Sequence, residues 1–97
     1  HVGSPALDAY LVSEINLISY YEQHRQFADA EDCLWKAIDV AGPDPEIVER
    51  GLMFYNTCRR YADGRLEEGN LPRDEVEEGH AELRELAIRQ GIIEPED

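Results

Sequence analysis

The sequence predicts an all-α protein of four main helices arranged as antiparallel helical hairpins. Apolar residues recur with helical spacing in four segments, and no segment alternates apolar and polar residues as a strand would. Gly42-Pro43 and Gly91 follow two of these segments as helix-ending signals. The 97 residues suit a single helical domain, 1–97. We interpret residues 1–4 as a remnant of cloning or processing and residues 94–97 as a frayed acidic tail.

The first two predicted helices have clear apolar stripes. The first runs from about residue 5 to His24, with Ser4 as its expected N-cap. The second runs from about residue 27 to Ala41 and has the most regular periodicity in the chain. Its apolar positions are Phe27, Ala30, Leu34, Ala37, Ile38 and Ala41. Because three of them are alanine, we expect another helix to approach this face closely.

The third predicted helix begins at a capping signal. The Asp44 carboxylate can accept hydrogen bonds from free amides, and Pro45 suits the first helical position. This helix is apolar on more than one face, so we expect it to be the central, most buried element. It should weaken or end at residues 62–64, before a short turn over residues 65–68.

The last predicted helix runs from about residue 72 to Gln90. Leu71 and Val76 can form a hydrophobic staple at its start. Gly91 fits its C-terminal cap, with Ile92 folding back onto the last turn.

The charge of the chain limits its classes of partner. Twenty-two acidic and nine basic residues give a net charge of −13. Such a surface repels phosphate backbones and anionic lipids, so we expect neither nucleic-acid nor membrane binding. The sequence shows no membrane-spanning run and no secretion signal, which predicts a cytoplasmic protein. Cys33 and Cys58 are then expected to be buried thiols and not a disulfide.

Residues 11–55 have the small and large apolar positions of a stacked helical hairpin. In a unit starting at Leu11 these positions are Leu17, Tyr21, Ala30, Leu34 and Ala37, and in a second unit starting at Asp44 they are Gly51 and Phe54. The pattern resembles the tetratricopeptide repeat, which implies helix-turn-helix stacking in the first three helices. Glu14, Asp63, Glu67 and Asn70 depart from it, so the resemblance covers about one and a half units.

The resemblance implies a peptide-binding groove lined by first-helix residues. The matching positions are Ser19, Glu22, Gln23, Tyr55 and Asn56. Fewer than three units make a poor groove, so dimerisation is an equal expectation. Trp35 and Phe54 lie off the main apolar stripes, with Tyr20 and Met53, which favours a contact surface.

Arg59 belongs to the one basic island of the sequence. Its other members are Arg50, Arg60 and Arg65. The island can dock an acidic peptide or the acidic C-terminal helix of another copy, or simply pair with the protein's own glutamates. The predicted partner-binding residues are therefore Ser19, Glu22, Gln23, Trp35, Phe54, Tyr55, Asn56 and Arg59.

These observations predict a non-catalytic protein-interaction or scaffolding module that self-associates as a homodimer. Glu77 and His80 have the spacing of a di-iron ligand pair, but a second pair is missing and His80 lies between apolar residues. We therefore predict no metal, cofactor or catalytic residue, and a metal-dependent helical enzyme is the least favoured alternative. An acidic mimic of nucleic acid that binds a basic protein is the main alternative.

Overall fold

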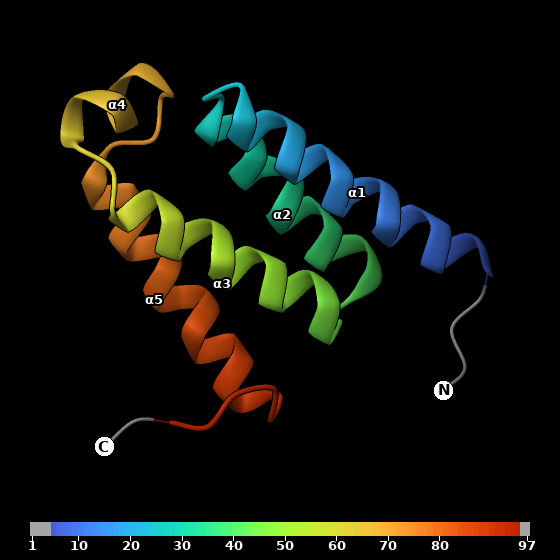
Figure 1. Ribbon diagram of the computed structural model, residues 1–97. Helices are drawn as coiled ribbons and strands as arrows, with labels where there is room; N and C mark the ends of the chain where they lie inside the picture. The colour runs from blue at the N-terminus through green and yellow to red at the C-terminus, as the bar shows by residue number, and fades with distance from the viewer. Residues whose placement is uncertain (1–4, 96–97) are drawn as a thin grey trace.

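The computed structural model describes residues 5–95, and within that range the chain forms five α-helices (Figure 1). They are α1 (Pro5–Gln23), α2 (Phe27–Ala41), α3 (Pro45–Arg59), α4 (Asp63–Glu68) and α5 (Arg73–Arg89). No strand occurs in the described range, and the four long helices confirm the predicted all-α fold class. The expected N-cap Ser4 lies outside the described residues.

The α1–α2 hairpin turns on a residue with a left-handed backbone. Arg25 has a φ of 59°, and the Gln26 N–H donates to the Tyr21 carbonyl at 2.8 Å. This hydrogen bond closes the last turn of α1, in a motif whose left-handed position glycine usually occupies. The helix ends at Gln23, one residue before the predicted end.

The α2–α3 turn follows the predicted capping. Gly42 has a φ of 82° and its N–H donates to the Ile38 carbonyl. The Asp44 carboxylate accepts a hydrogen bond from the Glu46 N–H at 2.9 Å, and Pro45 occupies the first turn of α3. The reversal is therefore fixed by local chemistry on both sides.

The short helix α4 connects α3 to α5. α3 ends at Arg59, and the predicted short turn is α4, which starts two residues earlier than expected. The Gly69 carbonyl, at the end of α4, accepts a hydrogen bond from the Ala28 N–H at 3.0 Å. Since Gln26 makes no side-chain cap, the start of α2 is capped by this distant carbonyl.

The end of α5 confirms the predicted glycine cap. Gly91 has a φ of 72°, and its N–H donates to the Ile88 carbonyl at 3.0 Å. The Ile92 N–H donates to the Ala87 carbonyl at 2.9 Å, so the chain folds back onto the last turn. At the other end of α5, Leu71 and Val76 are both fully buried, as a hydrophobic staple requires.

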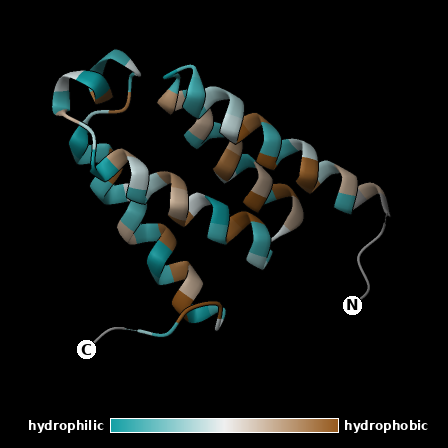
Figure 2. Cartoon of the chain, viewed as in Figure 1, coloured by the Kyte–Doolittle hydropathy of each residue, from teal (hydrophilic) through white to brown (hydrophobic). Residues whose placement is uncertain are grey.

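The helix α3 is the centre of the core. Figure 1 shows it lying between the α1–α2 hairpin and α5. Its buried residues are Ile47, Val48, Gly51, Phe54, Tyr55 and Cys58. The expectation that this helix is the most buried element is therefore correct. By contrast, Figure 2 shows mainly hydrophilic residues in α4 and at the start of α5.

Three helices of the core approach one another closely at Gly51. A Cβ atom on Gly51 would lie 2.6 Å from Leu34 Cδ1 of α2 and 2.7 Å from Leu83 Cδ2 of α5. Both leucines are fully buried, so neither can move without opening the core. The missing side chain of Gly51 thus sets how closely α2 and α5 pack on α3.

A polar contact fixes α1 against α3. Arg50 Nη2 donates to Glu22 Oε1 at 2.7 Å and to Ser19 Oγ at 3.1 Å. The Arg50 and Glu22 side chains are each 17% exposed, so solvent screens this ion pair less than a surface pair.

We predict that Gly51→Ala destabilises the protein by about 1–3 kcal/mol because the added methyl group overpacks the core. Gly64→Ala is the matched control, since nothing lies within 4 Å of its Cβ position and it lies within α4. The control should gain up to about 1 kcal/mol from the helix preference of alanine. Urea unfolding followed by circular dichroism measures both, and a Gly51→Ala variant as stable as the wild type would contradict the packing argument.

Candidate functional site

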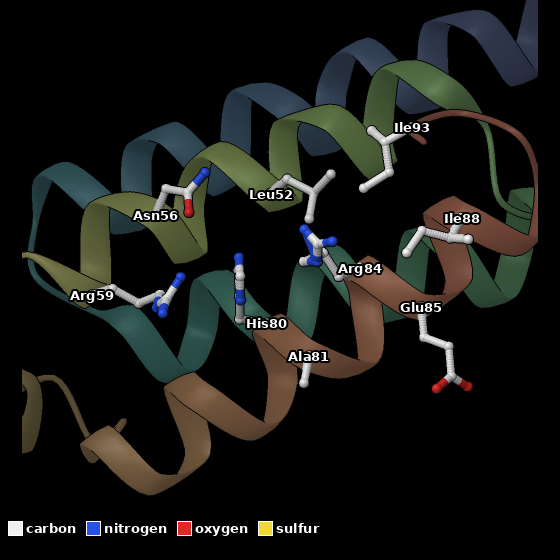
Figure 3. Close-up of a pocket in the computed structure, with 9 residues that line it drawn as sticks. All are labelled: Leu52, Asn56, Arg59, His80, Ala81, Arg84, Glu85, Ile88 and Ile93. Atoms are coloured by element: carbon white, nitrogen blue, oxygen red, sulfur yellow. The ribbon is translucent and has the colours of Figure 1, made fainter. Parts of the chain in front are cut away.

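An open groove runs between α3 and α5 and ends at the C-terminal segment (Figure 3). It has a volume of about 780 Å³. Its lining residues are Leu52, Asn56, Arg59, His80, Ala81, Arg84, Glu85, Ile88 and Ile93. Successive turns of α3 and α5 supply all of these side chains except Ile93, which belongs to the C-terminal segment, because residues three or four apart share one face of a helix.

The two ends of the groove differ in chemistry. Figure 3 shows Arg59, Asn56 and His80 at one end, with Arg84 beside Leu52 in the middle. Ile88 and Ile93 lie toward the other end, and the Glu85 carboxylate points away from α3. The groove therefore offers positive charge at one end and apolar surface at the other.

His80 lies among the cations of the groove. Burial lowers the pKa of His80 below its ordinary value, and the charges of Arg59 and Arg84 lower it further, while Glu77 opposes them. Its ring stands edge-on to the Tyr55 ring, with centroids 6.4 Å apart. The neutral imidazole is thus favoured until an anion approaches it.

Glu77, the other half of the predicted ligand pair, is engaged by guanidinium groups. Its Oε2 accepts a hydrogen bond from Arg59 Nε at 3.1 Å and lies 4.0 Å from Arg73 Nη1. Within residues 5–95, no group of three or more His, Cys, Asp and Glu side chains is arranged to hold a metal ion. The spacing of Glu77 and His80 is explained by ion pairing and packing.

A polar cluster lies on the other side of α5, against α2. Trp35 Nε1 donates a hydrogen bond to the Tyr55 hydroxyl at 2.8 Å, and this hydroxyl donates to Glu31 Oε2 at 2.6 Å. Gly79 makes room for the cluster, since a Cβ atom there would collide with the Tyr55 hydroxyl and meet the Glu31 carboxylate. Glu75, Glu78 and Glu82 line the hollow around it.

The electrostatics of this cluster follow from burial among carboxylates. Burial raises the pKa of Glu31, and the nearby charges of Glu75, Asp32 and Glu82 raise it further, while the hydrogen bond from Tyr55 lowers it. Burial and the Glu31 carboxylate also raise the pKa of Tyr55. The phenol therefore stays protonated and serves as a hydrogen-bond donor.

The two cysteines are free thiols, as predicted, but only Cys58 is buried, whereas Cys33 is partly exposed. Burial raises the pKa of Cys58 to about 12, and burial also raises the pKa of Cys33. Because the thiolate is the nucleophile, neither group is poised for nucleophilic attack at neutral pH.

The structure separates the residues that the sequence grouped as partner-binding. Asn56 and Arg59 line the groove between α3 and α5. Ser19 and Glu22 instead bind Arg50 at the α1–α3 contact, and Gln23 is exposed at the end of α1. A single groove holding this whole set is therefore not present in the described part of the chain.

Two of the sequence expectations on exposure are wrong. Phe54 and Tyr55 are fully buried, whereas a contact surface requires exposed side chains. Phe54 packs in the core because α3 is covered by α2 on one side and by α1 and α5 on others. Trp35 is half-buried against the core, and its indole N–H donates a hydrogen bond to the Tyr55 hydroxyl.

The sequence reasoning missed Arg84, Ile88 and Ile93 as lining residues. His80, Arg84 and Ile88 recur every fourth residue, which predicts one shared helix face. That spacing alone gives no indication that α3 borders the same face. Only the packing of α5 on α3 makes them a groove.

The fold and the groove define an all-α protein of packed helices with a charged groove on its surface. The chain belongs to the family of unknown function DUF6483, whose family model matches residues 5–87. No curated protein and no solved structure matches the chain. Over the described residues, no helix has the length and apolar character needed to cross a membrane.

We predict that Glu31→Gln raises the melting temperature at neutral pH. The amide oxygen can still accept the Tyr55 hydrogen bond, while the half-buried negative charge is removed. Because the folded pKa of Glu31 is raised above its ordinary value of 4.5, its contribution to stability is lost as pH rises through the folded pKa. The gain should therefore be present at about pH 7 and vanish near about pH 4.

Thermal melts across this pH range measure the effect. Glu49→Gln, at an exposed position of α3, is the control for the general benefit of removing one negative charge. An equal gain in both variants, or a gain that does not depend on pH, would contradict the role of burial.

Proposed function

We propose that this protein is a non-catalytic protein-interaction module that self-associates. The observation that carries the proposal is the open groove between α3 and α5, which combines cationic side chains with apolar ones. Protein interfaces use the same combination, with arginine enriched and an apolar centre. The groove follows two helices, which suits a row of side chains on another helix.

Exposed apolar side chains elsewhere support association. Met53 on α3 is 62% exposed, and Val12 and Tyr20 on α1 are 57% and 53% exposed. Covering such surface contributes roughly 25 cal/mol for each Å² of apolar area removed from water. Tetratricopeptide-like stacking of the first three helices is consistent with a role in binding a protein partner.

The chemistry of the titratable groups supports a non-catalytic role. Both thiols are protonated at neutral pH, and Glu77 is held by two arginines. An interaction module needs neither an activated nucleophile nor a bound metal.

Sedimentation velocity from about 1 µM to about 1 mM protein tests self-association, because this range covers binding free energies of about −8 to −4 kcal/mol. We expect the weight-average mass to rise with concentration above the 11.1 kDa of one chain. A single 11.1 kDa species over the whole range would refute self-association.

An acidic mimic of nucleic acid is a second candidate, favoured by a row of exposed carboxylates on α5. Asp74, Glu78 and Glu82 follow one another at intervals of one helical turn. If this row of carboxylates mimics the phosphates of DNA, the protein should compete with immobilised DNA for basic proteins of the host cell and release them. The variant Asp74→Asn/Glu78→Gln/Glu82→Gln should lose that ability, and equal release by both forms, or none, would count against mimicry.

A further inference from the structure

The two sides of α5 carry opposite charges. His80 and Arg84 line the groove toward α3, whereas Glu78 and Glu82 precede each of them by two residues. Two residues correspond to about 200° around a helix axis, so the carboxylates lie on the side of α5 away from the groove. One helix therefore presents Arg84 to the groove, whose lining also includes Glu85, and a row of carboxylates in another direction.

The acidic side is available for contact. Its exposed residues Asp74, Glu78 and Glu82, which we call the acidic crest, project from successive turns of α5. Within residues 5–95 none of the three forms an ion pair. Successive crest carboxylates are about 6 Å apart along the helix axis.

The groove matches this crest in charge. Arg84 supplies a guanidinium group from α5, and His80, whose neutral form is favoured, lies one turn before it. Arg59 faces them from α3 and is paired with Glu77 at 3.1 Å. Because these two side chains are 43% and 45% exposed, their pairing is weak and an incoming carboxylate can replace it.

We propose that the groove between α3 and α5 of one copy binds the acidic crest of α5 of a second copy. This inference rests on the self-association proposed above and specifies its geometry. Arg59 and Arg84 hold the crest carboxylates, and Leu52 and Ile88 contact the helix that carries them. The groove and the crest are different surfaces, so the contact is head-to-tail and a bound copy keeps one surface open.

Head-to-tail contact predicts species larger than a dimer. A copy that donates its crest to one neighbour still has an open groove for the next. The products are therefore chains or closed rings, in place of the homodimer predicted from the sequence.

The net charge predicts how association depends on salt. Each copy carries a net charge of −13, so copies repel one another when salt is low and the Debye length is about 30 Å. At about 0.15 M salt the Debye length is about 8 Å, which screens this repulsion and leaves the contacts within the groove. Association should therefore be strongest near 0.15 M and weaker at both about 0.01 M and about 1 M.

Two neutralised variants test the geometry. Arg59→Gln/Arg84→Gln removes the cations of the groove, and Asp74→Asn/Glu78→Gln/Glu82→Gln removes the crest charges. Each variant alone should associate at least about tenfold more weakly than the wild type, since each lacks one half of every contact. Matched controls at exposed sites are Arg65→Gln/Arg89→Gln and Glu49→Gln/Glu67→Gln/Glu68→Gln, and both should associate as the wild type does.

Mixing the two variants gives the decisive result. The groove variant still has an intact crest, and the crest variant still has an intact groove. In an equimolar mixture the first can therefore bind the second, and the resulting pair has no intact surface left for a third copy. Native mass spectrometry with one variant labelled with ¹⁵N should show a 1:1 heterodimer and no larger species. Circular dichroism establishes that both variants keep the helical fold.

The outcomes separate this inference from the proposed function. If the wild type associates and either neutralised variant associates equally well, the groove–crest contact is wrong while self-association stands. A mixture of the two variants that stays monomeric while the wild type associates also overturns the groove–crest contact. A wild type that remains monomeric at every concentration and salt overturns both.

Discussion

The close approach of three helices at Gly51 is the constraint on which the rest of the structure depends. Leu34 of α2 and Leu83 of α5 both reach the backbone of α3 at this position, where any side chain would push them away. α3 is therefore covered from two directions, and its residues on either side of this contact are fixed relative to α2 and α5. The groove lies where α5 meets α3, and the polar cluster lies where α5 meets α2.

This packing also gives the two sides of α5 different electrostatic surroundings. On the α2 side, the Tyr55 hydroxyl crosses beside Gly79 to bind Glu31, among carboxylates that raise the pKa of Glu31. On the α3 side, burial lowers the pKa of His80, and the charges of Arg59 and Arg84 lower it further. This strongly acidic chain thus has a groove with cationic side chains, because α3 and α5 bring two of its eight arginines, Arg59 and Arg84, to the same groove. This asymmetry makes head-to-tail contact between copies physically reasonable.

The fold was largely predictable, and the candidate site was predictable only in part. Asp44, Gly42 and Gly91 set helix ends through hydrogen bonds to residues within one or two turns, so their role is visible in the sequence. Asn56 and Arg59 were expected at a binding surface and do line the groove. Phe54 and Tyr55 were expected there too and are buried, because periodicity assigns residues to a face without showing how many helices cover it. The tetratricopeptide likeness stays a prediction, beside the established membership of DUF6483.

By itself the sequence determined the four long helices, their order and the ends that are capped locally, since these depend on side-chain periodicity and on capping within a few residues. It also determined the excess of negative charge. Only the tertiary structure decided that the Gly69 carbonyl caps α2 and that Arg84 and Arg59 share a groove. These contacts join residues distant in the chain, and their geometry follows from how side chains of α2 and α5 fill the space around α3, which no local pattern records.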